Sequence, residues 1–128
     1  MVLVLLTWAT QSPPMVISCY SLTTSLSRAR DLFDLLRSVS GPSLFMKGCI
    51  TSDIWQNPDN PGMFMLHEEW NSLSDLESHI SSPLYHRLLA AMELCIIKPQ
   101  VIFMDGQDIR GIEWVEQLRT IIAEREPK

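Results

Sequence analysis

The 128-residue sequence has few of the residues that carry metal, nucleotide or disulfide chemistry: three cysteines, three histidines and five glycines. The cysteines are far apart and form no C-x-x-C pair, and the histidines do not fall in an H-E-x-x-H pattern. No glycine-rich phosphate loop and no G-x-S-x-G elbow occurs. We therefore expect no metal, no bound cofactor and no disulfide framework, with free thiols as in a reducing cytoplasm.

Basic charge and long apolar runs are also scarce. Ten Lys and Arg stand against 15 Asp and Glu, a net charge of −5, and the basic residues form no run with interleaved aromatics. This pattern argues against a nucleic-acid partner. The apolar stretch from Val2 to Trp8 is too short to cross a bilayer and lacks the preceding cation of a signal peptide. We expect a cytoplasmic protein with no membrane partner.

The length leaves room for one domain. Residues 1–14 are predicted to form an N-terminal extension or an extra strand, which Ser12-Pro13-Pro14 separates from the rest. Residues 15–128 are predicted to form the domain itself, with a C-terminal helix over 111–124.

Hydrophobic periodicity predicts the order β-α-β-β-α-β followed by that last helix. The predicted elements are a strand over 15–22, a helix from about 26 to its end at 40–42, a hairpin over 48–70, short helices over 72–80 and 82–92, and a strand over 99–104. Ser72 to Asp75 resembles a capping box, and Ser82-Pro83 is predicted to start the next helix with Ser82 as its N-cap. The order predicts an α+β, ferredoxin-like fold, in which helices cover one face of a four-stranded antiparallel sheet.

The hairpin over 48–70 is the segment around which the chain is organised. Two-residue alternation predicts a strand on each side of a six-residue segment, Asn57-Pro58-Asp59-Asn60-Pro61-Gly62. Its two prolines and its turn-forming Asn, Asp and Gly residues predict a longer, rigid loop with no strand through it. The sheet face away from the helices would need cover, with Ile50, Ile54, Met63 and Met65 as candidates for it. Trp114, between polar residues of the last helix, is a candidate contact with another subunit.

Four pieces of sequence, in this order, resemble the antibiotic biosynthesis monooxygenase (ABM) domain family. They are Gly48-Cys49, Pro58 to Gly62, Glu68-Glu69-Trp70 and His79-Ile80-Ser81-Ser82, within a resemblance from about Met15 to Met104. The resemblance implies a dimeric α/β barrel, formed when two ferredoxin-like domains pair through their open sheet faces. It also implies a small-molecule ligand, with cofactor-independent oxygenation of an apolar or aromatic substrate.

Three residues are catalytic candidates: Trp70, Glu68 and His79. In some ABM-like monooxygenases the Trp that ends this strand lines the substrate pocket, so Trp70 would stack on a polycyclic phenol, or else plug the strand-to-helix corner as core. Glu68, on the same strand face, would act as a general base if buried, or else be a structural partner of His79 or an Arg. His79 would accept a proton from a phenol or anthrone, or else bond a backbone carbonyl at a helix end.

Substrate-binding candidates are Leu66, Leu76, Tyr85 and Leu89. In the quinone-forming members an Asn falls at the position of Leu66, a Tyr at Leu76 and an Arg at Leu89, so that set is not carried over. In haem-degrading relatives an Asn falls near Ser18 and a His near Leu89, so haem degradation is disfavoured.

Three functions stay open from the sequence. The first is a cofactor-independent monooxygenase-like enzyme. The second is a non-catalytic, dimeric ligand-binding or accessory protein. The third is an isomerase of a small carbonyl compound, which needs the same base but no O₂. A cavity at which Glu68, Trp70 and His79 converge would favour chemistry, and a space filled by Leu66, Leu76 and Leu89 would favour binding.

Overall fold

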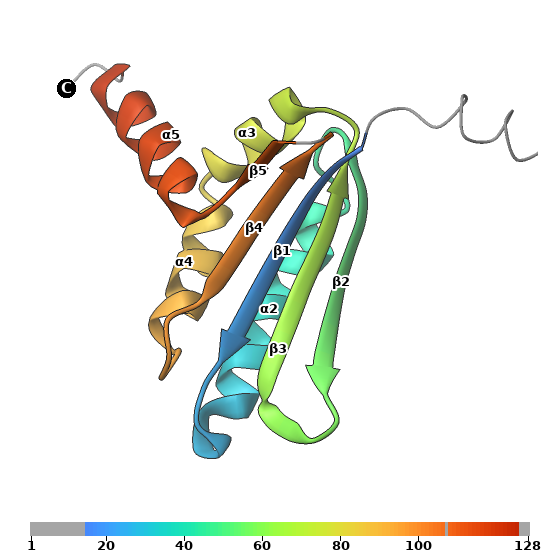
Figure 1. Cartoon of the computed structure of the whole chain (residues 1–128), viewed down its shortest axis with the longest axis vertical. Coiled ribbons are helices and arrows are strands. Elements are labelled where there is room, and N and C mark those ends of the chain that lie inside the picture. The colour runs from blue at the N-terminus through green and yellow to red at the C-terminus, as the bar shows by residue number, and fades with distance from the viewer. Residues whose placement is uncertain (1–14, 107, 126–128) are drawn as a thin grey trace, which may run out of the picture.

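A computed structural model describes residues 15–106 and 108–125, in which a five-stranded antiparallel sheet has the strand order β2-β3-β1-β4-β5 (Figure 1). The strands are β1 (Val16–Thr23), β2 (Cys49–Asn57), β3 (Asn60–Trp70), β4 (Gln100–Asp105) and β5 (Asp108–Arg110). The helices are the 3₁₀ turn η1 (Leu26–Arg28), α2 (Ala29–Ser43), α3 (Leu73–Ile80), α4 (Tyr85–Glu93) and α5 (Ile112–Arg125). The predicted ferredoxin-like α+β fold is confirmed, and the three-residue β5 is an addition too short to leave an alternation in the sequence.

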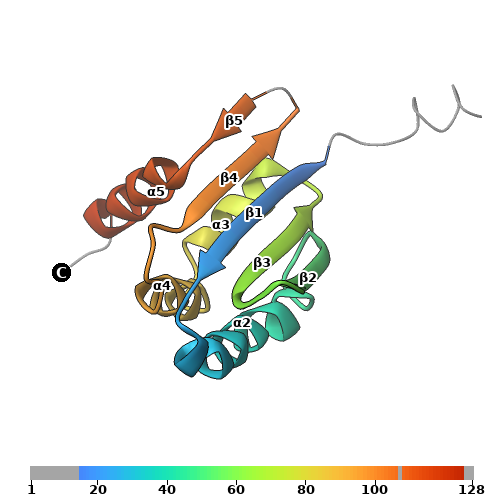
Figure 2. The same ribbon diagram turned by 60° about the horizontal axis from the view of Figure 1, so that its bottom comes forward.

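Helices α2, α3 and α4 pack on one face of the sheet (Figure 2), and that side holds the core. β1 alternates strictly, so Val16, Ser18, Tyr20 and Leu22 point to the helices. From β3 the residues Phe64, Leu66, Glu68 and Trp70 point the same way, and α2 meets them with Leu32, Leu36 and Val39. Each buried large apolar side chain of this kind contributes about 1.5–3 kcal/mol to folding.

The hairpin turn between β2 and β3 is tighter than predicted. Asn57 pairs with Asn60 across the two-residue turn Pro58-Asp59, and β3 already includes Pro61 and Gly62. The Asn57 Oδ1 atom accepts the N–H groups of Asp59 at 2.8 Å and Asn60 at 3.2 Å. The expected long loop was therefore wrong, because an asparagine side chain closes the turn locally.

Helix α2 also runs further than predicted, through Pro42 to Ser43. A proline inside a helix leaves the carbonyl four residues earlier without its N–H partner, here the carbonyl of Ser38. The Arg87 Nη1 atom of α4 donates to that oxygen at 3.2 Å. This long-range hydrogen bond gives the freed carbonyl a partner and ties α2 to α4.

The N-cap predicted at Ser72 is confirmed at the start of α3, although the Asp75 carboxylate accepts the Ser72 hydroxyl and not its N–H, whereas the predicted cap of α4 was wrong. The Ser72 Oγ atom accepts the N–H of Asp75 at 3.1 Å. Ser82 is not an N-cap: its hydroxyl donates to the His79 carbonyl at 2.7 Å and closes the end of α3, and α4 begins only at Tyr85.

The last helix lies where the sequence predicts it, but Trp114 faces the interior. Its side chain is buried against the edge of Phe103, with ring centroids 5.0 Å apart, and the Arg110 guanidinium lies 4.8 Å from its ring centroid. The predicted subunit contact of Trp114 was therefore wrong, because β5 turns this face of α5 onto the core. The extra strand predicted within residues 1–14 lies outside the described residues.

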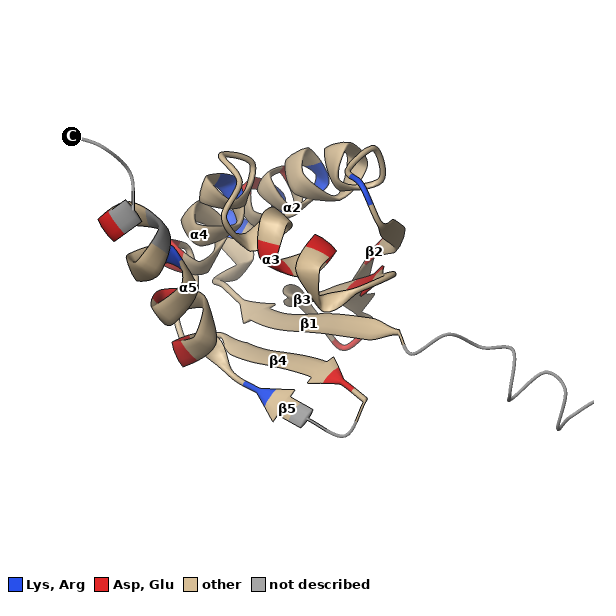
Figure 3. Cartoon of the chain, turned by 90° about the horizontal axis from the view of Figure 1, so that it is seen from above, with Lys and Arg blue, Asp and Glu red and all other residues tan. Residues whose placement is uncertain are grey.

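The opposite face of the sheet carries no element of the described chain (Figure 3). It exposes Met65, Ile102, Trp55 and Ile109, which are 39%, 44%, 63% and 70% exposed. We call these four residues the open sheet face patch. Met63 and Met65 lie on this face as predicted. Among residues 15–106 and 108–125, no helix is long and apolar enough to cross a membrane.

Ile54 was predicted on the open face and lies on the other. It pairs with Leu66 and therefore points to the helices. The register of β2 shifts between Cys49 and Thr51, so one residue of this strand is left over and the alternation is reset. A bulge of this kind leaves no mark in hydrophobic periodicity.

Candidate functional site

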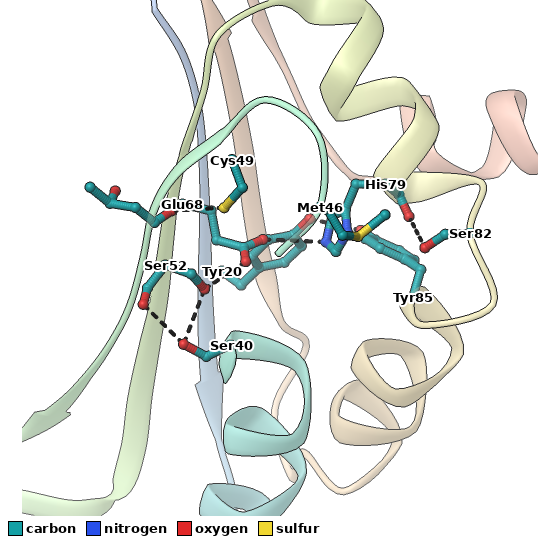
Figure 4. A network of polar contacts seen from close by, with 10 residues as sticks. Tyr20, Ser40, Met46, Cys49, Ser52, Glu68, His79, Ser82 and Tyr85 are labelled. Atoms are coloured by element: carbon teal, nitrogen blue, oxygen red, sulfur yellow. Dashed lines mark hydrogen bonds and ion pairs between the residues drawn. The ribbon is translucent and has the colours of Figure 1, made fainter. Parts of the chain in front are cut away.

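A buried carboxylate forms the centre of the site. Glu68 lies on β3 between Ser18 of β1 and Ser52 of β2, and its side chain is fully buried. The Oε2 atom accepts a hydrogen bond from the Ser52 hydroxyl at 2.7 Å, and Oε1 lies 3.4 Å from the Nε2 atom of His79 (Figure 4). Burial of a carboxylate costs free energy of folding unless the group is paired and hydrogen-bonded. A buried carboxylate held beside an imidazole is therefore a candidate functional group.

His79 is held against Glu68 from three sides. The cap at Ser72 fixes the start of α3, and the imidazole stacks on the Trp70 indole with ring centroids 4.7 Å apart. Its Nδ1 atom lies 3.2 Å from the Met46 sulfur, which belongs to the segment joining α2 to β2 (Figure 4). The imidazole therefore bonds no backbone carbonyl among the described residues, contrary to the alternative that the sequence left open.

The contacts of His79 leave its Nε2 atom facing Glu68. The thioether sulfur of Met46 is a weak acceptor, which suits an N–H at Nδ1. Nε2 then faces Glu68 Oε1 at 3.4 Å, and neither atom has a hydrogen-bond partner among the described residues. The pair thus offers atoms that can accept a proton out of contact with water, as a general base must.

Trp70 closes the site at the end of β3. Its side chain is fully buried, and its Nε1–H has no hydrogen-bond partner among the described residues. A buried N–H without a partner costs about 1–3 kcal/mol. The indole therefore forms an apolar wall against His79 and leaves its own N–H unpaired in the interior.

Two tyrosines complete the interior. Tyr20 of β1 and Tyr85 of α4 share a hydrogen bond between their hydroxyl oxygens at 2.8 Å, and the Tyr85 ring meets His79 edge-on with centroids 5.4 Å apart. Burial, the other tyrosine and the nearby Glu68 carboxylate raise the pKa of Tyr20 well above its usual value. The pKa of Tyr85 is raised too, chiefly by burial.

These pKa shifts predict cooperative loss of the fold in alkali. Tyr20 and Tyr85 are the only tyrosines of the chain. Because their folded-state pKa values lie above the value of about 10 in an unfolded chain, stability is complete below that pH and falls as the pH rises further. We expect tyrosinate absorbance and circular dichroism to change together in one steep alkaline transition. A gradual rise in tyrosinate absorbance near pH 10, with the circular dichroism unchanged, would contradict the buried pair.

A short hydroxyl chain leads from Glu68 to the surface. The Ser52 Oγ atom lies 3.1 Å from the Oγ of Ser40 on α2, and Ser40 donates to the Ser52 carbonyl at 2.9 Å (Figure 4). Both serines line a surface hollow of about 330 Å³ between α2 and β2, whose walls include Phe33, Arg37 and Ile54. We call it the α2–β2 hollow.

The site is closed to solvent. Glu68, Trp70, His79 and Tyr85 come together with zero exposure, so no water-sized space touches them. Leu66 and Leu76 are also fully buried and Leu89 is partly buried, and all three belong to the core. The structure therefore brings the catalytic candidates Glu68, Trp70 and His79 together, with no open cavity among them.

Sequence reasoning missed Tyr20, Ser40, Ser52 and Met46. The alternation of β1 places Tyr20 on the helix face together with Ser18, which is a usable signal. Ser52 follows the β2 irregularity, and Ser40 and Met46 meet their partners only through tertiary packing. No sequence pattern marks those two.

Cys49, also beside Glu68, is not an activated thiol. Burial, followed by the charge of Glu68, raises the pKa of Cys49 to about 12. A thiol so far from ionisation at neutral pH is a poor nucleophile. Across the part of the chain that the structure describes, no three His, Cys, Asp or Glu side chains are grouped to hold a metal ion.

Comparison with known proteins gives one family and many similar folds. The family model described as antibiotic biosynthesis monooxygenase matches residues 18–91. No curated protein gives a significant sequence match to the chain.

Three solved structures illustrate the similarity in fold. The structure of Rv0793 from Mycobacterium tuberculosis is 23% identical over 73% of this chain and 96% of its own, with a TM-score of 0.66. A conserved protein from Methanosarcina mazei Go1 is 19% identical over 77% and 99%, with a TM-score of 0.70. A structure named as an antibiotic biosynthesis monooxygenase is 16% identical over 73% and 99%, with a TM-score of 0.65. At these identities the likeness concerns the fold alone.

Proposed function

The chain belongs to the antibiotic biosynthesis monooxygenase family, and on that premise we propose that it is a cofactor-independent monooxygenase of a small aromatic substrate. The observation that carries the proposal is the buried pair of Glu68 and His79, with 3.4 Å between Oε1 and Nε2, set against Trp70. An acid–base pair shielded from water inside an aromatic wall suits removal of a weakly acidic proton.

The proposed reaction needs only the substrate and O₂. Glu68 and His79 take a proton from the acidic carbon of an anthrone, which leaves a carbanion, or from a hydroxyl of a hydroquinone-like compound, which leaves a phenolate. For an anthrone, the carbanion reduces O₂ and a C–O bond forms. The CH₂ group becomes a carbonyl, one oxygen atom stays in the product, and the other leaves as water. Trp70, stacked on the imidazole, holds His79 beside Glu68.

The working form is proposed to be a homodimer. The open sheet face patch of Met65, Ile102, Trp55 and Ile109 is apolar and has no cover among the described residues. Burial of such a patch against a second copy removes it from water, at roughly 25 cal/mol per Å². Pairing of the two sheets would give the α/β barrel that the family resemblance implies.

Oxygen uptake tests the proposed activity. We would incubate the protein with a panel of anthrones and hydroquinones, with and without a chelator, and expect uptake that survives chelation. Glu68→Gln and His79→Gln keep the side-chain volume but remove the base, so each should lower kcat about 100-fold or more. Glu69→Gln is the control, because Glu69 is the next residue on β3 and faces away from the site. Uptake abolished by the chelator, or unchanged in Glu68→Gln, would contradict the mechanism.

A second candidate function is a non-catalytic ligand-binding or accessory protein. The closed packing favours it, because Leu66 and Leu76 fill the space beside the pair. In that case Glu68 and His79 hold β3 to α3 and do no chemistry. No uptake across the panel would favour this function, unless an isomerised product of a small carbonyl compound were found in the same incubations.

A further inference from the structure

The α2–β2 hollow lies outside the residues that the family resemblance would assign to a substrate. Its volume of about 330 Å³ is at the low end of the range for small-molecule sites. Phe33 and Ile54 give it apolar walls of the kind that accept an aromatic ring. Asp53 also borders the hollow. It pairs with His67 across β2 and β3, however, so its side chain points to the open sheet face and not to the helices.

The cation of the hollow is Arg37. Its guanidinium carbon lies 5.8 Å from the Phe33 ring centroid, an arrangement that holds the planar group over the aromatic wall. Within residues 15–106 and 108–125, Arg37 forms no ion pair, whereas Arg30, over the same ring at 5.7 Å, pairs with Asp34 at 3.2 Å. Arg37 is therefore the cation at Phe33 with donors free for an anion, and a planar guanidinium suits a carboxylate or phenolate.

The floor of the hollow reaches the buried base. Ser40 and Ser52 line it, and Ser52 is 7% exposed. The Oγ atoms of Ser40 and Ser52 lie 3.1 Å apart, and the distance from Ser52 Oγ to Glu68 Oε2 is 2.7 Å. Two hydroxyls thus join a surface hollow to a carboxylate that no water touches (Figure 4). A hydroxyl both donates and accepts, so such a chain can pass a proton.

We propose that the α2–β2 hollow binds an aromatic compound bearing a carboxylate or phenolate, which Arg37 recognises, and that Ser40 and Ser52 pass its acidic proton to Glu68. The second half of this proposal rests on the proposed function, and the first half does not. The substrate stays in the hollow while the base stays buried. The zero exposure of Glu68 and His79 then agrees with a role in proton removal.

The proton transfer conserves every hydrogen. Ser40 accepts the ligand proton at Oγ and turns its own proton from the Ser52 carbonyl to the Ser52 hydroxyl. Ser52 passes its proton to Glu68 Oε2 along the 2.7 Å hydrogen bond that already exists. The ligand is left with the electron pair of the broken bond, and one proton has been added to the Glu68–His79 pair.

Binding is tested without O₂. We would titrate the intact protein under argon with 1-hydroxy-2-naphthoate and with its neutral methyl ester, following heat or ligand fluorescence. Arg37→Gln should weaken naphthoate binding about 10- to 100-fold, the size of a lost charge-assisted hydrogen bond, and should leave ester binding unchanged. Arg30→Gln is the matched control, because it removes the same charge from a second arginine over the Phe33 ring, one that lines a different hollow.

Three results would overturn the binding half: no naphthoate binding by the wild type, equal affinity in Arg37→Gln and wild type, or loss in Arg30→Gln instead. The last would place the ligand in the neighbouring hollow of about 260 Å³, which Arg30 lines with Gln56 and Phe64. None of these results depends on oxygenation.

The relay is tested by hydrogen exchange. Under argon in D₂O, 1,8-dihydroxyanthrone bound to the protein should exchange its CH₂ hydrogens faster than it does free in solution. Ser40→Ala should slow that exchange about tenfold or more with ligand affinity kept. Ser38→Ala is the control, because among the described residues its hydroxyl bonds within α2 alone, to the Leu35 carbonyl at 2.6 Å.

Exchange and oxygen uptake separate the two proposals. Wild-type exchange that Ser40→Ala leaves unchanged, or no enhanced exchange at all, would overturn the relay. Exchange that depends on Ser40 in a protein with no oxygen uptake would support the relay and refute the oxygenase. In that case the isomerase, which needs the base without O₂, becomes the better function.

Discussion

Glu68→Ala should lower the free energy of unfolding by about 3–5 kcal/mol, because it leaves one partner of a fully buried pair alone. His79 Nε2 and the Ser52 hydroxyl both lose their contact with the carboxylate, and the fully buried His79 is not reached by water in its place. A domain of this size is stable by about 5–15 kcal/mol, so the change should move the urea midpoint far down. Urea unfolding followed by tryptophan fluorescence at fixed protein concentration measures it.

Two further variants separate charge from packing. Glu68→Gln keeps the volume and an acceptor for Ser52, so it should cost clearly less than Glu68→Ala. Glu68→Leu combined with His79→Leu removes both polar partners and should recover most of the loss, since a buried pair replaced by apolar side chains is often neutral or better. Glu116→Ala, an exposed change on α5, should stay within about 0.5 kcal/mol of the wild type. A Glu68→Ala protein as stable as the wild type would mean that the carboxylate is not buried against His79 in solution.

The second large effect concerns assembly. Met65→Lys places a cation in the middle of the open sheet face patch, on a strand that has neighbours on both sides. If two copies pair through this face, the lysine ammonium loses its water there, and the cost of about 2–5 kcal/mol should raise the dimer dissociation constant by a factor of 30 or more. Sedimentation velocity over a range of concentrations should show a dimer for the wild type and a monomer for Met65→Lys.

Phe45→Lys is the matched control for that change. Phe45 is 93% exposed, more than any patch residue, but it lies in the segment between α2 and β2 and not on the sheet. It should leave the dimer intact. A wild type that stays monomeric at high concentration, or an equal loss of dimer in both variants, would refute pairing through the open face.

Most of the fold can be derived from the sequence by itself. Local patterns predicted the strands and helices in the correct order, because they record which side of each element is buried. These patterns are the two-residue alternation in 15–22 and 48–70 and the apolar stripe of 26–39. They placed Glu68 and Trp70 on one strand face, and with the family resemblance they pointed to His79. The N-cap at Ser72 was readable for the same reason: both partners lie within four residues.

Only the tertiary structure decided what surrounds those residues. The irregularity between Cys49 and Thr51 put Ile54 and Ser52 on the helix side, since one extra residue reverses the face of everything beyond it. Arg87 carried α2 past Pro42 through a contact 49 residues away in sequence. The hydroxyl chain of Ser40, Ser52 and Glu68 joins α2, β2 and β3, and the Met46 contact joins the α2–β2 segment to α3. Hydrophobic periodicity reports burial and not partners, so which polar groups meet inside the core is decided by packing between elements.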